Sequence, residues 1–359
     1  MPVTLITTST TAAGTSVTVA ENTLTIISAG TTQVSTTTNA VANLATSTNC
    51  DVRIDGTVHA QGAGVLLATD GTSSGHSLLV GQGGLIFGNS GTGATLNGAN
   101  ALLTNHGSIG SLTGNGLQMG GIGAVALNFG LISSEYGFGA VMAGAGAVLR
   151  NFGDMTSTNG IGLSVAGSTD NLVGRTIALS GSFSADRFIN AGTISGSVNL
   201  NGGDDRFIGT GGSAVAVLGG TGIDTIRGGD FDGDLNGEQD DDVLSGRAGD
   251  DILTGGAGMD VMRGGAGQDE FVFASYNEMG NSLLSDVING FVSREDKINL
   301  GAIPGLTFIG NAAFGSVAGQ ARYVKAAGQL QFDANGDGVA DFFPQLDPGT
   351  VLLAGDLIL

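Results

Sequence analysis

Aspartates recur at a fixed spacing near the C-terminal end of this 359-residue chain. Six nonapeptides run without a gap from Gly219 to Val272, and each begins with glycine. The sixth positions of these repeats hold Asp224, Gly233, Asp242, Asp251, Asp260 and Asp269. A row of carboxylates supplies the oxygen ligands that hard divalent cations bind. We therefore predict that the five aspartates are metal ligands.

The expected ion is Ca²⁺. Two carboxylates one strand spacing apart, about 4.8 Å, repel by about 0.9 kcal/mol in water and by about 3.5 kcal/mol at an effective dielectric near 20. A divalent cation between successive turns reverses this repulsion and takes backbone carbonyls as further ligands. Flexible all-oxygen sites favour Ca²⁺ over Mg²⁺, and glycine allows the turn carbonyls to point inward. The alternative is an array of solvated acidic loops. Chance alone would not keep the sixth and eighth positions of the repeat in phase over six copies.

A second acidic loop has the sequence DANGDGVAD, residues 333–341. The first, third, fifth and ninth positions of an EF-hand-like loop are filled by Asp333, Asn335, Asp337 and Asp341. Gly338 stands at the sixth position, where such a loop turns, but Pro344 replaces the bidentate glutamate at the twelfth. The pattern leaves two alternatives, a weaker Ca²⁺ site or an Asx-rich hairpin turn.

Other residues with catalytic potential are isolated in the sequence. The three histidines lie far apart, at His59, His76 and His106. None begins an H-E-x-x-H motif, which excludes a zinc protease of that kind. Ser73 lies in a G-x-S-x-G match, but a chain with 66 glycines contains such matches by chance. In the middle of the chain, Glu135 and Asp154 are the one pair of acids that could lie close together. We therefore expect no catalytic site.

The nonapeptides predict the element that positions the aspartates. Each should form a six-residue turn and a three-residue strand, so that two repeats make one coil and residues 18 apart stack at the strand spacing. The eighth positions are apolar and should form the core: Ile226, Leu235, Leu244, Leu253, Met262 and Phe271. The segment LNGGDDRFI, residues 200–208, is a weaker copy one residue out of register.

A different repeat, of 23 residues, occupies the middle of the chain, where QGGLI, NHGSI, NFGLI and NFGDM begin at residues 82, 105, 128 and 151. Apolar residues recur with this period: Leu79, Leu102, Val125 and Val148; Ile86, Ile109, Ile132 and Met155; Leu96, Met119, Met142 and Val165. Alternation within each copy predicts short strands. We expect the copies to stack as a right-handed parallel β-helix, with every column inside the coil. A side-chain amide ladder is expected from Gln82, Asn105, Asn128 and Asn151.

The charge balance restricts the partners. The formal net charge is −20, and most of the acids lie after residue 200. Such a chain repels nucleic acid and anionic membranes, so cations are the expected partners. The single cysteine, Cys50, excludes a disulfide framework within the chain. The opening residues MPVTLITTST lack the features of a Sec signal, and no stretch is long enough for a membrane span.

The nonapeptides resemble the RTX, or hemolysin-type calcium-binding, family. The resemblance implies a parallel β-roll with Ca²⁺ between its turns. It implies carboxylate ligands from Asp224, Asp242, Asp251, Asp260 and Asp269, and turn carbonyls from Gly222, Gly249, Gly258 and Gly267. Gly233 and Phe231 break the pattern in the second repeat, which puts the sites of that turn in doubt.

The chain after the repeats, from DEFVFASYNEMG through LTFIGNAAFGSVAGQARYV to QLQFDANGDGVADF, is similar to the C-terminal region of serralysin-type proteins, which caps the roll. With the nonapeptides, the resemblance covers roughly residues 200–359. In that family the extreme C-terminus is an uncleaved type I secretion signal, an acid followed by apolar residues. The final segment fits this description with Asp356, Leu357, Ile358 and Leu359. The resemblance implies secretion by the type I machinery of a Gram-negative bacterium, and the alternative is that these residues are a plain final strand.

Together these observations predict an all-β chain in which a right-handed parallel β-helix continues into a calcium-binding parallel β-roll with a C-terminal β cap. The expected domains are a Thr-rich N-terminal cap or arm (1–50), the β-helix (51–200), the nonapeptide β-roll (201–273) and the cap with its secretion signal (274–359). We expect a secreted calcium-binding structural protein, a surface-layer, matrix, adhesin or filament component that binds itself or cell-surface glycans. The alternative is a glycan-modifying enzyme, an epimerase or lyase, or a glycan-binding module.

Overall fold

The computed structural model describes residues 2–43, 47–67, 74–143, 148–157, 163–165, 168–172, 175–176, 179–180, 185–190, 193–211, 213–281 and 284–359. The regular elements in these residues are β-strands and two short 3-10 helices, which confirms the all-β prediction. The chain forms two compact units, Met1–Ser182 with Asp186–Gly196, and Phe183–Ala185 with Ser197–Leu359. We call them the β-helix unit and the β-roll unit.

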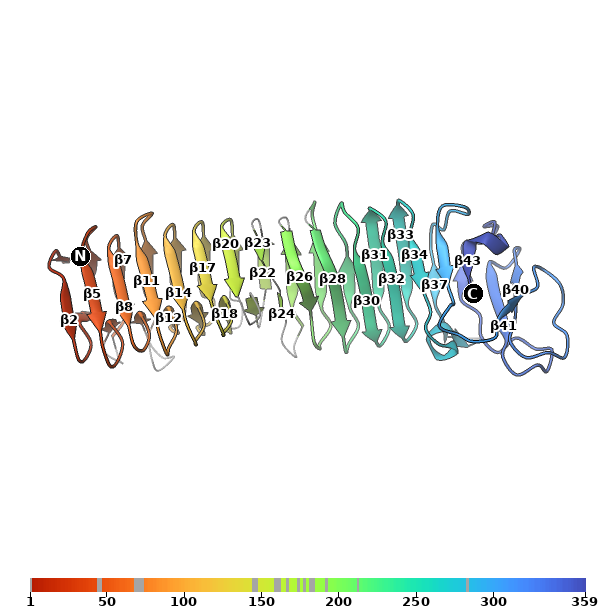
Figure 1. Ribbon diagram of the computed structural model, residues 1–359, viewed down its shortest axis with the longest axis horizontal. Helices are drawn as coiled ribbons and strands as arrows, with labels where there is room; N and C mark the ends of the chain where they lie inside the picture. Colours follow the sequence, from red (N-terminus) through yellow and green to blue (C-terminus); the bar gives the residue numbers. More distant parts are fainter. Residues whose placement is uncertain are drawn as a thin grey trace. The chain divides into compact units, whose positions relative to one another are not determined.

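The β-helix unit is built from rungs of parallel strands (Figure 1). Strands of successive rungs pair in three rows, which we call the first, second and third sheets. The first sheet contains β1 (Val3–Ile6), β4 (Leu24–Ile27), β7 (Asp51–Ile54), β10 (Ser77–Val80), β13 (Leu102–Asn105), β16 (Val125–Asn128), β19 (Val148–Asn151), β22 (Ser168–Leu172) and β25 (Arg187–Asn190). The second contains β2 (Thr10–Ala12), β5 (Thr32–Ser35), β8 (Thr57–Ala60), β11 (Leu85–Gly88), β14 (Ser108–Ser111), β17 (Leu131–Ser134), β20 (Asp154–Ser157), β23 (Arg175–Thr176) and β26 (Thr193–Asn199). The third contains β3 (Val17–Val19), β6 (Val41–Asn43), β9 (Val65–Leu67), β12 (Ala94–Leu96), β15 (Leu117–Met119), β18 (Ala140–Met142), β21 (Leu163–Val165) and β24 (Leu179–Ser180).

Residues before Asp51 continue the same stack. Strands β4, β5 and β6 pair in parallel register with β7, β8 and β9, for example Leu24 with Asp51. The Thr-rich segment therefore forms rungs of the β-helix unit, with no break at residue 50.

Alternation along the strands decides which repeated columns form the core. Ile86, Ile109, Ile132 and Met155 are buried, and so are Leu96, Met119 and Met142, as predicted. The side chain of Val165 lies outside the described residues. The prediction that Leu79, Leu102, Val125 and Val148 lie inside the coil is wrong. Leu102 pairs with Val125 on the outer surface and is 42% exposed, whereas its neighbour Leu103 is fully buried.

Buried asparagines form the amide ladder. The Nδ2 atom of Asn105 donates to Oδ1 of Asn128, and Nδ2 of Asn128 donates to Oδ1 of Asn151, each over 2.7 Å. All three side chains are fully buried. Gln82 is exposed and does not join them, because two additional residues between β10 and β11 place Val80 opposite Asn105.

The β-roll unit has two parallel sheets, with one strand of each in every coil. One sheet contains β27 (Arg206–Gly209), β29 (Thr225–Arg227), β31 (Val243–Ala248), β33 (Val261–Ala266) and β37 (Val287–Ile288). The other contains β28 (Ser213–Gly220), β30 (Asp234–Gln239), β32 (Ile252–Ala257), β34 (Glu270–Val272), β38 (Lys297–Asn299) and β43 (Leu357–Ile358). Thr225 pairs with Val243 and Val243 with Val261, which is the predicted 18-residue register. All six eighth-position side chains are at most 1% exposed and form the core.

The C-terminal part of the β-roll unit adds shorter elements to these sheets (Figure 1). They are the helices η1 (Tyr276–Met279) and η2 (Ala354–Asp356) and the strands β35 (Gly280–Asn281), β36 (Leu284–Ser285), β39 (Thr307–Phe308), β40 (Gln320–Val324), β41 (Gln329–Asp333) and β42 (Gln345–Leu346). Strand β42 pairs with β37, and β43 pairs with β38, so this region closes the roll.

Candidate metal centre

The sixth-position aspartates of the β-roll unit lie in two columns. Asp224, Asp242 and Asp260 form one column, and Asp251 and Asp269 form the other. In each column the backbone N–H of one aspartate donates to Oδ1 of the aspartate 18 residues later. The distance is 2.8 Å from Asp224 to Asp242 and from Asp242 to Asp260, and 3.1 Å from Asp251 to Asp269. The register thus brings the predicted carboxylates together, coil upon coil.

Three aspartates that the sequence analysis missed extend these columns. At one end of the first column, the backbone N–H of Asp205 donates to Oδ1 of Asp224. At the other end, Oδ1 of Asp286 accepts from the backbone N–H of Asp260. Asp296 accepts from Asp269 in the second column. Each of the three is followed two residues later by a buried apolar side chain, as in the repeats. This short pattern was the available signal, but the glycine-rich turn before it is absent or out of register.

The second carboxylate oxygen of six column aspartates has no donor within the described residues. Oδ2 of Asp224, Asp242, Asp251, Asp260, Asp269 and Asp286 is buried and accepts no hydrogen bond from any residue that the structure describes. Burying an ionised oxygen without a partner costs several kcal/mol. Each such oxygen therefore needs either a proton or a cation.

The first-position glycines leave the space that these oxygens face. A Cβ atom on Gly237 would contact Oδ2 of Asp242 and lie 2.6 Å from the carbonyl oxygen of Gly255. A Cβ on Gly246 would contact Oδ2 of Asp251 and lie 2.8 Å from the carbonyl oxygen of Gly264. Carboxylate and carbonyl oxygens thus converge beside glycines, which is the donor set that Ca²⁺ prefers.

The turn backbone supplies the remaining candidate ligands. The predicted carbonyl donors have left-handed backbones, with φ of 110° at Gly222, 107° at Gly249, 151° at Gly258 and 132° at Gly267. Within the described residues, no N–H donates to the carbonyl oxygen of any of the four. No group of three Asp, Glu, His or Cys side chains in the described ranges is arranged to hold a metal ion alone. A cation between the turns would therefore depend on these backbone oxygens.

The second repeat departs from the others, as the sequence predicts. Gly233 takes the place of an aspartate, and its N–H donates to Oδ1 of Asp251 over 2.8 Å. Phe231 is 60% exposed at a position where most of the other turns have glycine. This turn contributes no carboxylate to its column.

Burial raises the pKa of the five sixth-position aspartates. The pKa rises to about 8 for Asp242, about 7 for Asp251 and about 6 for Asp224, Asp260 and Asp269. Loss of solvation is the largest cause in each case, and neighbouring carboxylates add to it. The pKa of Asp286 rises to about 8 for the same reason. The columns are therefore costly to ionise unless a cation accompanies them.

Without Ca²⁺, the β-roll unit should gain stability as the pH falls from about 8 to about 5. The pKa of Asp242 is about 8 in the fold against 3.8 for an ordinary carboxyl. Between these values the folded state binds more protons than the unfolded state, so the free energy of unfolding falls as the pH rises. Protons compete with Ca²⁺, so the calcium midpoint should rise as the pH falls.

Circular dichroism in calcium-stripped buffers of different pH measures this dependence. Asp242→Asn removes the group with the highest pKa among the predicted ligands and should flatten it. A circular dichroism signal for β structure that weakens on acidification without Ca²⁺ would contradict the proposed burial of the aspartate columns.

The acidic loop at 333–341 forms the connection that follows β41. The two carboxylate oxygens of Asp333 accept from the N–H groups of Gly336 and Gly338 over 2.6 and 2.9 Å. The amide of Asn335 donates to the carboxylates of Asp337 and Asp341. The four predicted side chains do converge, but the donors of the loop itself satisfy them. This is the geometry of an Asx-rich turn, and a weaker Ca²⁺ site here stays a prediction.

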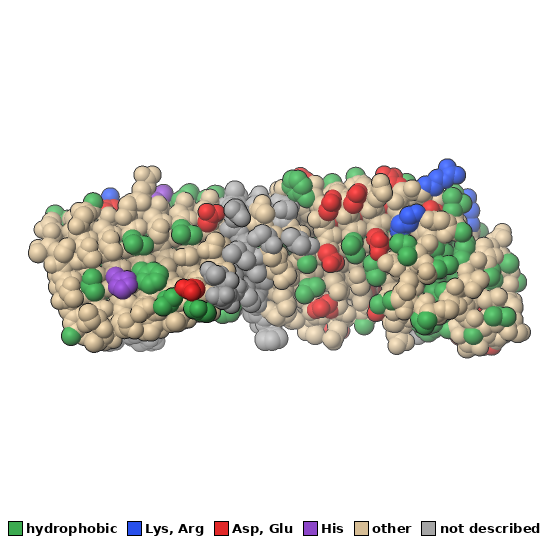
Figure 2. Space-filling view, in the orientation of Figure 1, with side chains coloured by type: hydrophobic (Ala, Val, Ile, Leu, Met, Phe, Trp, Pro, Cys, Tyr) green, Lys and Arg blue, Asp and Glu red, His purple; other side chains and the backbone are tan. Residues whose placement is uncertain are grey.

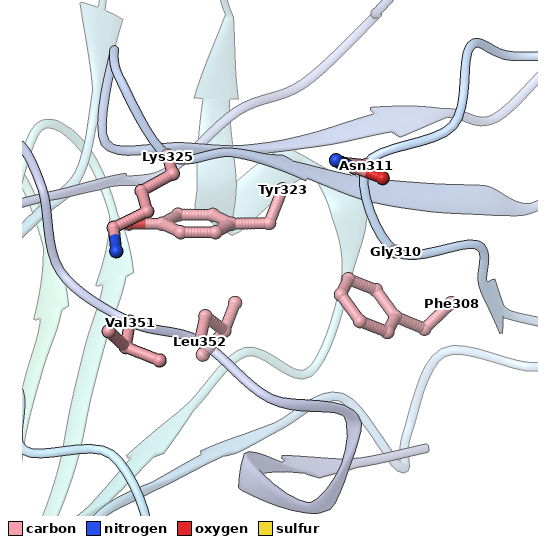
Figure 3. Close-up of a pocket in the computed structure, with 7 residues that line it drawn as sticks. All are labelled: Phe308, Gly310, Asn311, Tyr323, Lys325, Val351 and Leu352. Atoms are coloured by element: carbon pink, nitrogen blue, oxygen red, sulfur yellow. The ribbon is translucent and has the colours of Figure 1, made fainter.

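The remaining candidates for chemistry are not brought together. Asp154 pairs with Leu131 at the start of β17, whereas Glu135 follows the end of that strand. His59 stacks on Phe87, His106 stacks on Phe129, and His76 is buried. Ser73 lies outside the described residues. In the cap, a cavity of about 240 Å³ lies between Tyr323 and Leu352 (Figure 3). Its lining includes Phe308 and the exposed Lys325 but no acid, histidine, serine or cysteine.

Acidic side chains gather on the β-roll unit, whereas the same view of the β-helix unit shows few (Figure 2). Residues 235–271 match the family model of the RTX calcium-binding nonapeptide repeat, in four copies. No curated protein matches the chain. The match covers the segment in which the two aspartate columns and their glycine turns are most regular. These residues are therefore RTX, or hemolysin-type, calcium-binding repeats, and Ca²⁺ is the ion that such repeats bind.

Proposed function

We propose that this protein is a secreted calcium-binding structural protein whose β-roll unit folds on Ca²⁺ outside the cell. The buried Oδ2 atoms of the five sixth-position aspartates carry the proposal, because the described residues supply no donor to them. The ligands we propose are Asp224, Asp242, Asp251, Asp260 and Asp269, with the carbonyl oxygens of Gly222, Gly249, Gly258 and Gly267. Extracellular calcium modules bind Ca²⁺ at about 10⁻⁴ to 10⁻³ M, so such a unit stays unfolded until it meets an exterior rich in calcium.

Export through a type I system of a Gram-negative cell fits this dependence, since a chain that is unfolded inside the cell can pass through a narrow channel. RTX repeats are typical of proteins that such systems export. In the described residues, no helix has the length and apolar character required to cross a membrane. We infer that the segment from Asp356 to Leu359 contributes to the export signal.

The structural role is supported by the repeated ladders of the β-helix unit and by the separation of Glu135 from Asp154. A surface layer, an extracellular matrix, an adhesin and a filament all need a regular, rigid unit with a repeated outer surface. Self-association or binding of cell-surface glycans would complete such a role.

Deleting residues 300–359 should keep the protein inside a Gram-negative host that carries a type I exporter, whereas the full chain should reach the medium. Immunoblots of cells and medium measure the distribution. Ser293→Ala is the control for folding, because it removes the hydroxyl that donates to the buried Asp356 but leaves residues 356–359 unchanged, and it should reach the medium like the full chain. Equal amounts of the deletion variant and the full chain in the medium would refute the proposed C-terminal signal.

A further inference from the structure

The outward face of the first sheet of the β-helix unit is apolar over many strands. In β1, β4, β7, β10, β13, β16 and β19, the first and third residues point outward and the second and fourth point inward. We call the outward side chains of these seven strands the outer strip. Most of them are Leu, Val or Ile, although the chain has a net charge of −20. Val3, Leu5 and Leu102 are 60%, 58% and 42% exposed.

The outer strip is similar in area to the largest apolar patch of a typical monomer. Seven strands at the strand spacing span roughly 30 Å, and four residues along each strand span roughly 13 Å. Two such faces in contact would bury about 800 Å² in projection, at the small end of protein interfaces. The largest apolar patch on a typical monomer is about 300 to 600 Å² and is often a functional contact surface.

The chemistry of the outer strip favours a flat apolar partner. The neighbouring aromatic rings of His106, Phe129 and Phe152 stack on one another, with ring planes within 9°, so each ring covers a face of the next. A sugar binds by stacking on the face of an aromatic ring, and the stacking of these rings on one another leaves less ring face accessible. The net charge of the chain opposes a polyanion or an anionic membrane. A second copy of this chain presents a flat apolar face of equal size.

Of the three charged side chains in the outer strip, Asp51 and Arg53 are self-complementary, and Arg150 lies at the far end, on β19. Asp51 and Arg53 are the first and third residues of β7 and both point outward. Asp51 accepts from the Ser77 hydroxyl through Oδ1, and the Nε of Arg53 donates to Asp55 over 2.7 Å. A two-fold axis parallel to the coil places each strand against the same strand of the second copy and exchanges the first and third columns. Arg53 of each copy then lies opposite Asp51 of the other.

We propose that two copies of this chain associate through the outer strip, face to face, about a two-fold axis parallel to the coil. The interface is isologous, so the pairing closes at a dimer. It deepens the structural role proposed above by naming the partner, and it does not depend on the calcium sites. The small area implies a weak dimer, with a dissociation constant of about 1 to 100 μM.

Sedimentation velocity of the calcium-loaded full chain over this concentration range tests the proposal. We expect a concentration-dependent dimer that Leu102→Lys with Val125→Lys weakens at least about tenfold, because it places two charges in the apolar strip. Ile122→Lys is the matched control, since Ile122 is 69% exposed in a turn outside the strip, and it should leave the dimer unchanged.

Charge reversal tests the orientation. Asp51→Lys and Arg53→Glu should each weaken the dimer, and the double variant should restore it, because both cross-pairs are then formed again with reversed signs. A chain that stays monomeric throughout, or a control as damaging as the strip variants, would overturn the proposal, and so would a dimer that neither strip variant affects. Protection from trypsin by Ca²⁺ in the same samples reports on the calcium sites separately.

Discussion

In calcium-free buffer, trypsin should cleave the β-roll unit rapidly at Arg227, Arg247 and Arg263, and Ca²⁺ at about 0.1 to 1 mM should protect all three sites. Without the ion, the aspartate columns must either carry protons or bury unpartnered carboxylate oxygens, and at pH 8 most of them cannot keep a proton. The unit should therefore unfold, and the circular dichroism signal for β structure should rise cooperatively as Ca²⁺ is added.

Internal controls make this result specific. Arg53 and Arg150 lie in the β-helix unit, whose amide ladder and apolar columns need no ion, so their cleavage should be the same with and without Ca²⁺. Mg²⁺ at the same concentration should protect little, because it demands a near-ideal octahedral shell. Asp251→Ala with Asp260→Ala removes one carboxylate from each column and should raise the calcium midpoint. Equal resistance of Arg227, Arg247 and Arg263 in chelator and in calcium would end the proposal of calcium-driven folding.

Gly237→Ala should disable one calcium position without removing any carboxylate. The added Cβ would contact Oδ2 of Asp242 and lie 2.6 Å from the carbonyl oxygen of Gly255, so either the backbone or the aspartate must move. Overpacking of this kind costs about 1 to 3 kcal/mol, which corresponds to about 5- to 150-fold in an equilibrium constant. We expect the calcium midpoint to rise within this range, and isothermal titration calorimetry to count fewer bound ions.

Gly355→Ala is the matched control for this substitution. It lies in the same unit, and nothing is within 4 Å of the position that its Cβ would occupy. Its calcium midpoint should equal that of the unchanged protein. If Gly237→Ala also binds Ca²⁺ normally, the space beside the first-position glycines is not part of the metal centre.

The sequence predicted the β-roll better than the β-helix because its two repeated features have different chemistry. Position six is acidic and position eight is apolar, so Asp242 and Leu244 could be assigned to a ligand column and to the core. The 23-residue period repeats inward and outward columns alike, and Leu102 and Leu103 are both apolar. Periodicity alone therefore could not show that Leu102 lies outside.

Two further results were beyond a repeat-based argument. Gln82 fits the period of the asparagine ladder, but two additional residues in the turn before β11 move it out of the ladder. Asp286 and Asp296 complete the aspartate columns from the cap, where the glycine-rich turn is missing. Both outcomes depend on strand pairing between distant segments, and a single sequence does not display that pairing.

The pairing of the last coil with the cap restricts how this protein can vary in length. Strand β33 pairs with β37 and β34 pairs with β38, so each sheet of the roll has its own cap strand. Inserting or deleting 18 residues, one whole coil, preserves both partnerships and keeps each aspartate in its own column. A change of nine residues would exchange the two sheets at the cap and present Asp286 to the wrong column. Duplication during evolution, or lengthening by design, should therefore succeed in pairs of nonapeptides and fail with single ones.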